Sequence, residues 1–553
     1  MIISVNIAKK AFGDNTLYED LQFDIQDGEK VALIGRNGTG KTTLLHIISG
    51  EDADYDGAIT YKKNTIVVSS RQEHHKYENM PVLDYILDDL PEYKTLHTII
   101  STYPTTMGNK TRKIQEYSDA LERFSQLGYF EAESDITELL KNYQLSEVVI
   151  ANSMGQLSGG QKRLVELAKV QRSRAHVAVI DEPTNHMDYI AKKAFIKWFK
   201  AAKEAVIVIT HDRDLLHEVD KIIEIKDARA HSFNGNYDDY LRTNATKTVS
   251  AVHEYNVTQR RIANLKENVI RFRRLKEKSR DPGTIQRFKS LELKAQAELA
   301  KLDDIEAPSF WIDRESVDEL NEKVSASYQK HKAKNIKVRT NSTEKGVSRL
   351  LVDVTKLSLG YSDAPLFSDI TFQVREGDTL RLHGRNGAGK STLVNAIISK
   401  AKETPLVCKK FAGTIATERE LNIGIYEQEI AAKYLEMTLG QAIEEAYMAK
   451  DLPINDTKIK QLLGDYLFNP AIDAETPIQR LSGGQKARFQ LMNMLAGNPQ
   501  LLILDEPTNH LDLPSIEELE DALAGYSGAI LYISHDSYFA KNINSTQEVL
   551  LKS

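Results

Sequence analysis

The chain has 553 residues, of which 41% are hydrophobic and 27% charged, the balance of a folded globular protein with a sizeable core. No stretch approaches 18 consecutive apolar residues, so we expect no membrane span. The single cysteine, Cys408, excludes a disulfide framework and a thiolate zinc site, and we expect a cytoplasmic protein.

The net charge of −7 hides a local asymmetry. Residues 260–294 contain 12 basic and four acidic residues, a local charge of +8, so the rest of the chain carries −15. A basic segment on an acidic body indicates a local contact with a polyanion.

Four motifs occur twice in the same order, which indicates a duplicated domain. The distance from the serine of the LSGGQ motif to the histidine of the last motif is 53 residues in both copies. We expect one domain over residues 1–242, a basic helical linker over 243–345 and a second domain over 346–553. The pairs are GRNGTGKTT and GRNGAGKST (35–43, 384–392), LSGGQK (157–162, 481–486), IDEPTNHMD and LDEPTNHLD (180–188, 504–512), and ITHD and ISHD (209–212, 533–536).

The first motif follows a buried apolar strand and matches the phosphate-binding P-loop, GxxxxGK[ST]. Its glycines let backbone N–H groups wrap around phosphates, its lysine reaches the outer phosphates, and the next hydroxyl can ligate Mg²⁺. A chance glycine turn is the alternative, and two matches in a duplicated frame disfavour it. The candidate residues are Gly35, Asn37, Gly38, Gly40, Lys41, Thr42 and Thr43, then Gly384, Asn386, Gly387, Gly389, Lys390, Ser391 and Thr392.

Two kinds of side chain are expected beside each P-loop. Phe12 and Tyr361 both lie 29 residues before the P-loop lysine and can stack on a base, although a core position is a serious alternative. Gln72 and Gln428 follow candidate strands and can bind the metal or the attacking water; a solvated loop amide is the alternative.

The LSGGQ motif reads as a loop that enters a helix, with Ser158 or Ser482 as the N-cap. It resembles a second phosphate-binding helix start but has no lysine, so we expect it to complete another site. Its remaining candidate residues are Gly159, Gly160 and Gln161 in the first copy and Gly483, Gly484 and Gln485 in the second.

The DEP motif ends a buried parallel strand, so it delivers Asp181 or Asp505 to a metal. The adjacent Glu182 or Glu506 is expected to point to the other side and polarise a water in line with the γ-phosphate. A helix-capping acidic pair before proline is the alternative. The strand-end histidines of the last motif, His211 and His535, can contact the γ-phosphate; ordinary strand-end histidines are the alternative.

The segment between the copies carries a helical pattern. Tyr255, Ile262 and Val269 recur every seven residues, and DPGT at 281–284 is a turn signal before a second helical run. We predict an antiparallel hairpin with its tip near residues 278–286, in which residues 254–279 form a helix of about 39 Å. Its basic residues would bind RNA phosphates, whereas a solvated charged coiled-coil face is the alternative.

The ordered motifs are similar to those of the ATP-binding cassette (ABC) superfamily, and the paired DEPTNH(L/M)D motifs with a charged linker resemble its ABC-F branch. The resemblance implies an α/β fold of two P-loop ABC nucleotide-binding domains joined by an α-helical hairpin linker. It implies ATP and Mg²⁺ as ligands and a monomer whose cassettes close head-to-tail. The implied sites pair Lys41, Thr42, Asp181, Glu182 and His211 with Ser482 and Gly484, and Lys390, Ser391, Asp505, Glu506 and His535 with Ser158 and Gly160, with Asp188 and Asp512 crossing between them.

The resemblance also implies a cytoplasmic ATPase that acts on ribosomes. Linker residues 254–304 would enter the tRNA exit site and contact rRNA and tRNA, either to modulate translation or to displace antibiotics. A housekeeping translation factor with no drug role is the first alternative. A transporter's energy-coupling subunit and a DNA-repair or chromosome-organising ATPase are weaker alternatives, and intact P-loop lysines and DEP glutamates argue against an inactive scaffold.

Overall fold

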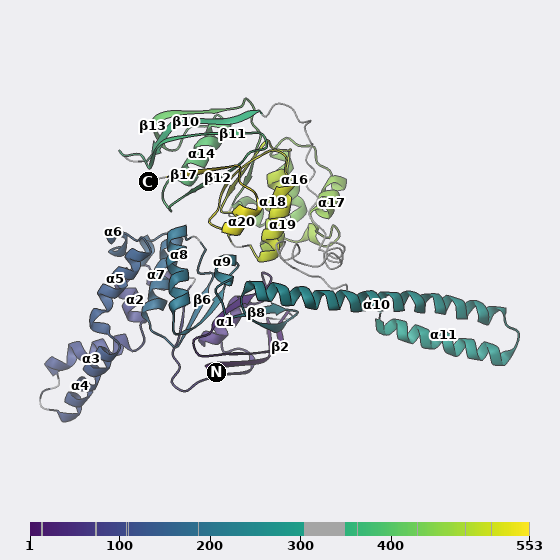
Figure 1. Cartoon of the computed structure of the whole chain (residues 1–553), viewed down its shortest axis with the longest axis horizontal. Coiled ribbons are helices and arrows are strands. Elements are labelled where there is room, and N and C mark those ends of the chain that lie inside the picture. The colour runs from purple at the N-terminus through teal and green to yellow at the C-terminus, as the bar shows by residue number, and fades with distance from the viewer. Residues whose placement is uncertain are drawn as a thin grey trace. The chain divides into compact units, whose positions relative to one another are not determined.

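The computed structural model separates the chain into two units, Met1–Tyr237 with Ile336–Ser553, and Asp238–Asn335. The described part of the first unit forms a pair of α/β domains, and the described part of the second is helical (Figure 1). The residues that the structure describes are 1–12, 15–71, 74–106, 108, 110–185, 187–302, 349–361, 363–427, 430–481, 483–509 and 511–551. Part of the predicted linker, residues 303–345, lies outside them.

The first domain is built on a six-stranded sheet in the order β5-β6-β7-β3-β8-β9, parallel except for the β8–β9 pair. Its three central strands are buried along their whole length, as their continuous apolar sequences predict. Register pairs Asp181 with Ile209, so the DEP and histidine motifs leave neighbouring strands at the same edge. The strands are β3 (Lys30–Ile34), β5 (Val67–Ser69), β6 (Val177–Asp181), β7 (Ala205–Ile209), β8 (Lys221–Lys226) and β9 (Arg229–Asn234).

A second, antiparallel sheet in the order β2-β1-β4 packs on the same core. It consists of β1 (Ile3–Phe12), β2 (Asn15–Ile25) and β4 (Asp56–Tyr61). The helices are α1 (Lys41–Ser49), α2 (Val82–Asp89), α3 (Tyr93–Thr106), α4 (Thr111–Gln126), α5 (Ala132–Asn142), α6 (Glu147–Ile150), α7 (Gly159–Arg172), α8 (Tyr189–Ala201) and α9 (Arg213–Leu216). The extra length of the first copy forms α3 and α4.

The second domain repeats this plan with a five-stranded parallel sheet, β14-β15-β16-β12-β17, and a three-stranded sheet, β11-β10-β13. The strands are β10 (Leu350–Gly360), β11 (Phe367–Arg375), β12 (Thr379–Gly384), β13 (Lys409–Thr417), β14 (Ile423–Tyr426), β15 (Leu501–Asp505), β16 (Ala529–Ile533) and β17 (Gln547–Leu551). The helices are α14 (Lys390–Ala401), α15 (Ala432–Leu435), α16 (Leu439–Met448), α17 (Asp456–Asp465), α18 (Gly483–Leu495), α19 (Leu513–Ala524) and α20 (Ser537–Asn542). The predicted pair of α/β domains is confirmed.

The helical unit is a hairpin of α10 (Tyr237–Lys278) and α11 (Pro282–Leu302), which run side by side (Figure 1). The rings of Phe272 and Phe288 stack across the seam with centroids 6.4 Å apart. At the tip, Asp281 Oδ2 accepts the backbone N–H of Thr284 at 2.8 Å and so begins α11. Among the described residues, every helix is too short or too polar to span a lipid bilayer.

Candidate functional site

The first P-loop joins β3 to α1, and the side chain of its lysine, Lys41, folds back onto the loop. Gly38 and Gly40 have φ values of 87° and 91°, the left-handed region that glycine adopts without strain. Lys41 is buried, and its Nζ donates to the carbonyl oxygens of Gly35 at 2.8 Å and Arg36 at 3.0 Å. The loop therefore holds a positive charge among exposed backbone amides at a helix start, the arrangement that binds phosphates.

The second P-loop, between β12 and α14, has the same geometry. Gly387 and Gly389 have φ values of 80° and 90°. Lys390 Nζ donates to the carbonyl oxygens of Gly384 at 2.8 Å and Arg385 at 3.1 Å. The two copies therefore form equivalent phosphate-binding loops.

A hydroxyl and a carboxylate meet at the start of each P-loop helix. Thr42 Oγ1 donates to Asp181 Oδ2 at 2.8 Å, and Ser391 Oγ donates to Asp505 Oδ2 at 2.8 Å. Hard oxygen ligands of this kind suit Mg²⁺, which usually binds to one or two protein oxygens and to phosphates. The residues present therefore fit a magnesium ion at each site.

The next residues, Glu182 and Glu506, have positive φ values of 46° and 48°, which are unusual for non-glycine residues. Their N–H groups donate to the carbonyl oxygens of Ile209 and Ile533, both at 2.9 Å. A turn that is hydrogen-bonded to the neighbouring strand therefore orients each carboxylate. The sequence had suggested that the alternation of side chains along a strand would do so. Burial, aided by the negative charge of Asp181, raises the pKa of Glu182 to about 8, and burial raises the pKa of Glu506 to about 7. A pKa near neutrality suits a general base.

The strand-end histidines lie against these glutamates. His211 Nε2 is 3.5 Å from Glu182 Oε1, and His535 Nε2 is 3.4 Å from Glu506 Oε1. Burial and the nearby P-loop lysine lower the pKa of His211 to about 3 and that of His535 to about 4. Both imidazoles are therefore neutral near pH 7 in this arrangement.

The LSGGQ motif forms the start of α7, as predicted. Ser158 Oγ accepts the backbone N–H of Gln161 at 3.3 Å, and Gln161 Oε1 accepts the N–H of Ser158 at 2.9 Å, a capping box. The glycines of this motif begin α7, and Gly483, Gly484 and Gln485 begin α18. Ser482 lies outside the described residues.

Each P-loop also meets the other cassette. The N–H of Asn37 donates to Asp512 Oδ2 at 2.9 Å, and the N–H of Asn386 donates to Asp188 Oδ2 at 3.4 Å. A Cβ added to Gly483 would lie 2.4 Å from Asn37 Nδ2, so the second LSGGQ motif lies against the first P-loop. The candidate site at Lys41 therefore contains residues from both halves of the chain.

The two candidate base-stacking residues lie on the surface. Phe12 is 55% exposed at the end of β1, with Lys10 Nζ 4.9 Å from its ring centroid. Tyr361 is 62% exposed, and its hydroxyl is 3.3 Å from Thr392 Oγ1. A core position is therefore wrong for both, and base stacking stays a prediction.

The structure brings most of the candidate residues of the first P-loop together in one pocket, but it does not describe two of the predicted metal ligands. Gln72 and Gln428 lie outside the described residues. The first pocket is lined by Leu17, Asn37, Gly38, Gly40, Lys41, Thr42, Thr43, Asp181, Glu182, Asn185, Ile209 and His211.

Sequence reasoning missed Arg163, whose guanidinium donates to the carbonyl oxygen of Asp181. The second copy has Ala487 at the same distance from its LSGGQ serine. This difference between otherwise matching motifs was the available signal. Arg163 ties α7 directly to the strand that carries the candidate metal ligand.

Comparisons with known proteins agree with this geometry. The ABC transporter family model matches residues 18–185 and 367–509, and a second ABC transporter model matches residues 223–318. The ribosome protection protein VmlR of Bacillus subtilis (strain 168) is 28% identical over 541 residues, which cover 97% of this chain and 84% of VmlR. The uncharacterized ABC transporter ATP-binding protein YfmM of the same organism is 27% identical over 554 residues, 98% and 97% of the two chains.

Among solved structures, the archaeal ribosome recycling factor aABCE1, in complex with ribosomal stalk protein aP1, has a similar fold. Its TM-score is 0.56 at 16% identity, over 98% of this chain and 87% of that one. The chain therefore belongs to the ATP-binding cassette family and is an ATP hydrolase. With two cassettes and an intervening extension, it is of the ABC-F type.

Proposed function

We propose that the chain is a ribosome-associated ATPase in which ATP binding closes the two cassettes and closure positions the hairpin on the ribosome. The name of VmlR, a ribosome protection protein that aligns along nearly the whole chain, supports ribosome association. The finer proposal is that the hairpin enters the tRNA exit site, through contacts with rRNA and tRNA, and modulates translation or displaces ribosome-targeting antibiotics.

The observation that carries the proposal is the contact of each P-loop with the opposite cassette. Asn37 meets Asp512 and Gly483, and Asn386 meets Asp188. A phosphate held by one cassette would therefore also be held by the LSGGQ helix of the other. Nucleotide binding favours whichever state completes the site, so ATP would draw the halves together.

The site residues divide into roles that follow from their chemistry. The P-loop lysines would bind the outer phosphates, and Thr42 with Asp181, and Ser391 with Asp505, would hold Mg²⁺, which neutralises phosphate charge. Glu182 and Glu506 would polarise the attacking water, with the neutral His211 and His535 beside them. Loss of the γ-phosphate would then free the opposite LSGGQ helix, and the cassettes would open.

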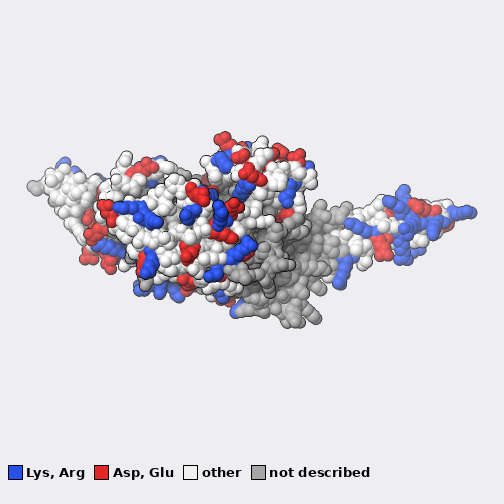
Figure 2. Space-filling view, turned by 90° about the horizontal axis from the view of Figure 1, so that it is seen from above, with Lys and Arg blue, Asp and Glu red and all other residues white. Residues whose placement is uncertain are grey.

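The hairpin offers the charge that an RNA contact requires. Its surface is rich in Lys and Arg (Figure 2). Six of these side chains are exposed and form no ion pair among the described residues: Arg271, Arg274, Lys278, Arg280, Arg287 and Lys289. Cations without an internal partner near a hairpin tip can neutralise phosphates, and such binding weakens as salt rises.

The central test is ribosome co-sedimentation of the Glu182→Gln/Glu506→Gln double variant with ATP. We expect this variant to bind ATP, to hydrolyse it at least 100-fold more slowly, and to stay on ribosomes, because removing a general base costs about 10²–10⁴-fold in rate. The control is Glu138→Gln/Glu444→Gln, which makes the same chemical change at two exposed glutamates. Normal turnover by the first variant, or no ATP-dependent binding to ribosomes, would contradict the proposal.

A second test concerns the hairpin. Replacing Arg271, Arg274 and Arg280 with glutamate should weaken ribosome binding and should make it less sensitive to salt, by about 0.7–0.9 in the log–log slope for each phosphate that the variant no longer neutralises. The control reverses three exposed lysines of the first cassette, Lys193, Lys197 and Lys203. Equally weakened binding in both variants would point to general electrostatics and not to the hairpin.

The drug role needs its own experiment. Cells that express the wild-type chain and cells that express the Glu182→Gln/Glu506→Gln variant would be compared on a panel of ribosome-targeting antibiotics. Protection by the active chain alone would favour drug displacement. Ribosome binding without protection against any drug would favour a housekeeping translation factor.

A further inference from the structure

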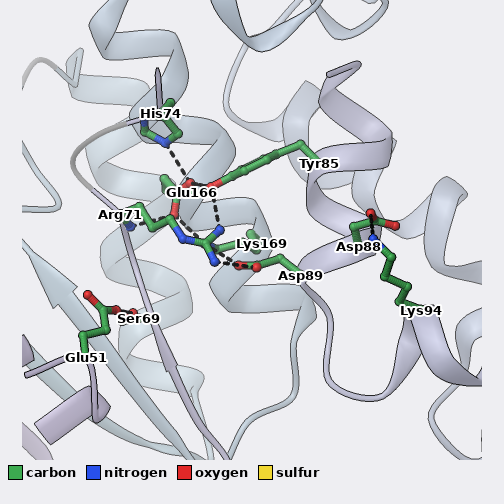
Figure 3. A network of polar contacts seen from close by, with 10 residues as sticks. All are labelled: Glu51, Ser69, Arg71, His74, Tyr85, Asp88, Asp89, Lys94, Glu166 and Lys169. Atoms are coloured by element: carbon green, nitrogen blue, oxygen red, sulfur yellow. Dashed lines mark hydrogen bonds and ion pairs between the residues drawn. The ribbon is translucent and has the colours of Figure 1, made fainter. Parts of the chain in front are cut away.

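The first cassette contains a buried cluster of polar side chains that the proposed catalytic roles do not use (Figure 3). We call it the Glu166 cluster. Glu166 and Lys169, both on α7, are 1% and 0% exposed. Charged groups this deeply buried are costly unless they are fully paired, so their partners show what the cluster holds together. Its members are Arg71, His74, Tyr85, Asp89, Glu166 and Lys169.

Glu166 is the centre of this cluster. Its Oε2 accepts the backbone N–H of Arg71 at 2.8 Å and lies 2.7 Å from Lys169 Nζ. Its Oε1 accepts the Tyr85 hydroxyl and lies 2.9 Å from His74 Nε2. Burial alone would raise the pKa of this carboxyl, but Lys169 and these hydrogen bonds lower it to about 2. Glu166 therefore stays ionised and fully bonded.

Asp89, at the end of α2, closes the cluster on its other side. Its Oδ2 lies 2.9 Å from Lys169 Nζ, and its Oδ1 lies 2.7 Å from Arg71 Nη2. Arg71 Nη1 also donates to the Tyr85 hydroxyl at 3.2 Å. Three parts of the first cassette are thus joined: the segment after β5, helix α2 and the LSGGQ helix α7.

The segment after β5 leads directly to the Lys41 site. Ser70, next to Arg71, accepts the backbone N–H of Asp181 on its Oγ at 3.2 Å. Helix α7, which carries Glu166 and Lys169, begins at the LSGGQ motif, and we assign this motif to the Lys390 site. The Glu166 cluster therefore lies between the candidate metal ligand of one ATP site and the LSGGQ helix start of the other.

The second cassette carries different residues at the positions that correspond to this cluster. Counted from the LSGGQ serine, Glu166 corresponds to Gln490 and Lys169 to Asn493. Counted from the starts of α2 and α16, Tyr85 and Asp89 correspond to Ala442 and Ala446; counted from Gln72 and Gln428, Arg71 and His74 correspond to Glu427 and Ile430. Gln490 Nε2 donates one hydrogen bond to the carbonyl oxygen of Glu427, at 2.6 Å.

This difference changes how firmly each LSGGQ helix follows its own nucleotide site. Hydrogen bonds to charged groups are roughly twice as strong as those between neutral groups, and a buried polar network whose members are bonded to one another is rigid. Charged contacts join α7 to the segment after β5 and to α2. In the second cassette, a neutral amide at Gln490 joins α18 to the segment after β14, and the charged pair of Arg488 with Glu518 joins α18 to α19 instead. A shift at the Lys41 site would be passed to α7 more completely than a shift at the Lys390 site is passed to α18.

We propose that Glu166 is a positioning residue and that its cluster is the main link between the two ATP sites, so that coupling runs through the body of the first cassette. This inference rests on the proposed composite sites. Because coupling is reciprocal in binding, a change of ATP affinity that this cluster transmits should be the same in both directions, beside any coupling through Asp188, Asp512 and Arg163. The two cassettes are then inequivalent although their catalytic motifs match.

The test is a thermodynamic cycle on ATP affinity at the Lys390 site, measured by isothermal titration calorimetry with the full-length chain. The first change, Lys41→Ala, disables the other site. The second, Glu166→Gln/Lys169→Asn, gives the first cassette the residues that the second has at these positions. In the otherwise wild-type chain, we expect Lys41→Ala to weaken ATP binding at the Lys390 site at least fivefold, which is the low end of usual coupling factors. In the Glu166→Gln/Lys169→Asn background, we expect Lys41→Ala to weaken it less than twofold.

The matched control is Gln490→Ala, which removes the side-chain hydrogen bond from α18 to the segment after β14. The coupling factor should be unchanged in this variant. Tyr85→Phe, which removes a single hydroxyl from the cluster, should give an intermediate factor with a melting temperature close to that of the wild type. A purely structural role for the cluster would lower the melting temperature and weaken both sites without changing their coupling.

Two failures remain distinguishable. If Lys41→Ala leaves the Lys390 site unaffected in the wild-type background, the composite sites themselves are refuted. If coupling is present but survives Glu166→Gln/Lys169→Asn, or is abolished equally in Gln490→Ala, the composite sites stand and the role of the Glu166 cluster is refuted.

Discussion

The two LSGGQ motifs differ in how closely they approach the opposite P-loop, and this difference gives a quantitative prediction for Gly483→Ala. An added Cβ at Gly483 would lie 2.4 Å from Nδ2 and 3.2 Å from Cγ of Asn37. A Cβ at the matching Gly159 would meet nothing within 4 Å. The same substitution should therefore obstruct one interface and leave the other open.

The expected loss of ATP affinity follows from the cost of moving the side chain that the added Cβ would meet. The obstructing atoms belong to the side chain of Asn37, which can rotate away at a cost of about 0.5–1.5 kcal/mol for an off-rotamer position. That cost corresponds to a roughly two- to tenfold loss of ATP affinity at the Lys41 site. Gly483 begins α18 without a positive φ, and alanine favours helices by up to about 1 kcal/mol, so the fold should not be destabilised.

The assay measures ATP binding at one site at a time. Gly483→Ala would be tested in a Lys390→Ala background, which leaves the Lys41 site, and Gly159→Ala in a Lys41→Ala background. We expect about a two- to tenfold loss of affinity for Gly483→Ala, by the rotamer cost above, and less than a twofold change for Gly159→Ala. Equal effects at the two sites, or none at the Lys41 site, would refute the reasoning.

Gly40→Ala combines a φ of 91° with a Cβ 1.9 Å from Leu17 Cδ2, so it should abolish ATP binding at that site and lower the free energy of unfolding by about 2 kcal/mol in urea titrations. Glu520 is 3% exposed and lies 3.1 Å from the guanidinium of Arg213. Arg213→Leu leaves this carboxylate buried without that cation, so the free energy of unfolding, measured in urea titrations, should fall by about 3–5 kcal/mol. Replacing Glu520 with Leu as well should recover most of this loss. Chelation of Mg²⁺ should stop hydrolysis, and Asp181→Asn should lower the rate and raise the Mg²⁺ concentration needed for half-maximal activity.

Much of the architecture was predictable because its signals are local. A P-loop has a fixed spacing of glycines and lysine, a buried parallel strand is a short apolar run, and a duplicated domain repeats both in order. The hairpin was equally visible, since heptad spacing and the DPGT turn at 281–284 are properties of adjacent residues. Most of the candidate site residues could therefore be named before any contact was known.

The backbone conformation that orients the candidate catalytic carboxylates was not predictable in this way. Strand alternation suggested that Glu182 simply points away from Asp181, but its positive φ is imposed by a hydrogen bond to Ile209 on the next strand. Burial of Phe12 was likewise open from sequence, because an aromatic residue near a strand end can face either the core or the solvent. The structure exposes it.

What the sequence alone determined, then, is the set of parts: two nucleotide-binding domains, the candidate residues for phosphate and metal binding, and a basic helical hairpin in the segment between the two domains. The family resemblance implied which half would meet which P-loop, but only the tertiary structure showed that Asn37 lies against Asp512 and Gly483 and that Glu166 joins the segment after β5 to α7. The physical reason is how far apart in the sequence the interacting residues are. Motifs depend on residues a few positions apart, whereas these contacts join residues up to 475 positions apart, and their energies depend on burial that no local pattern records.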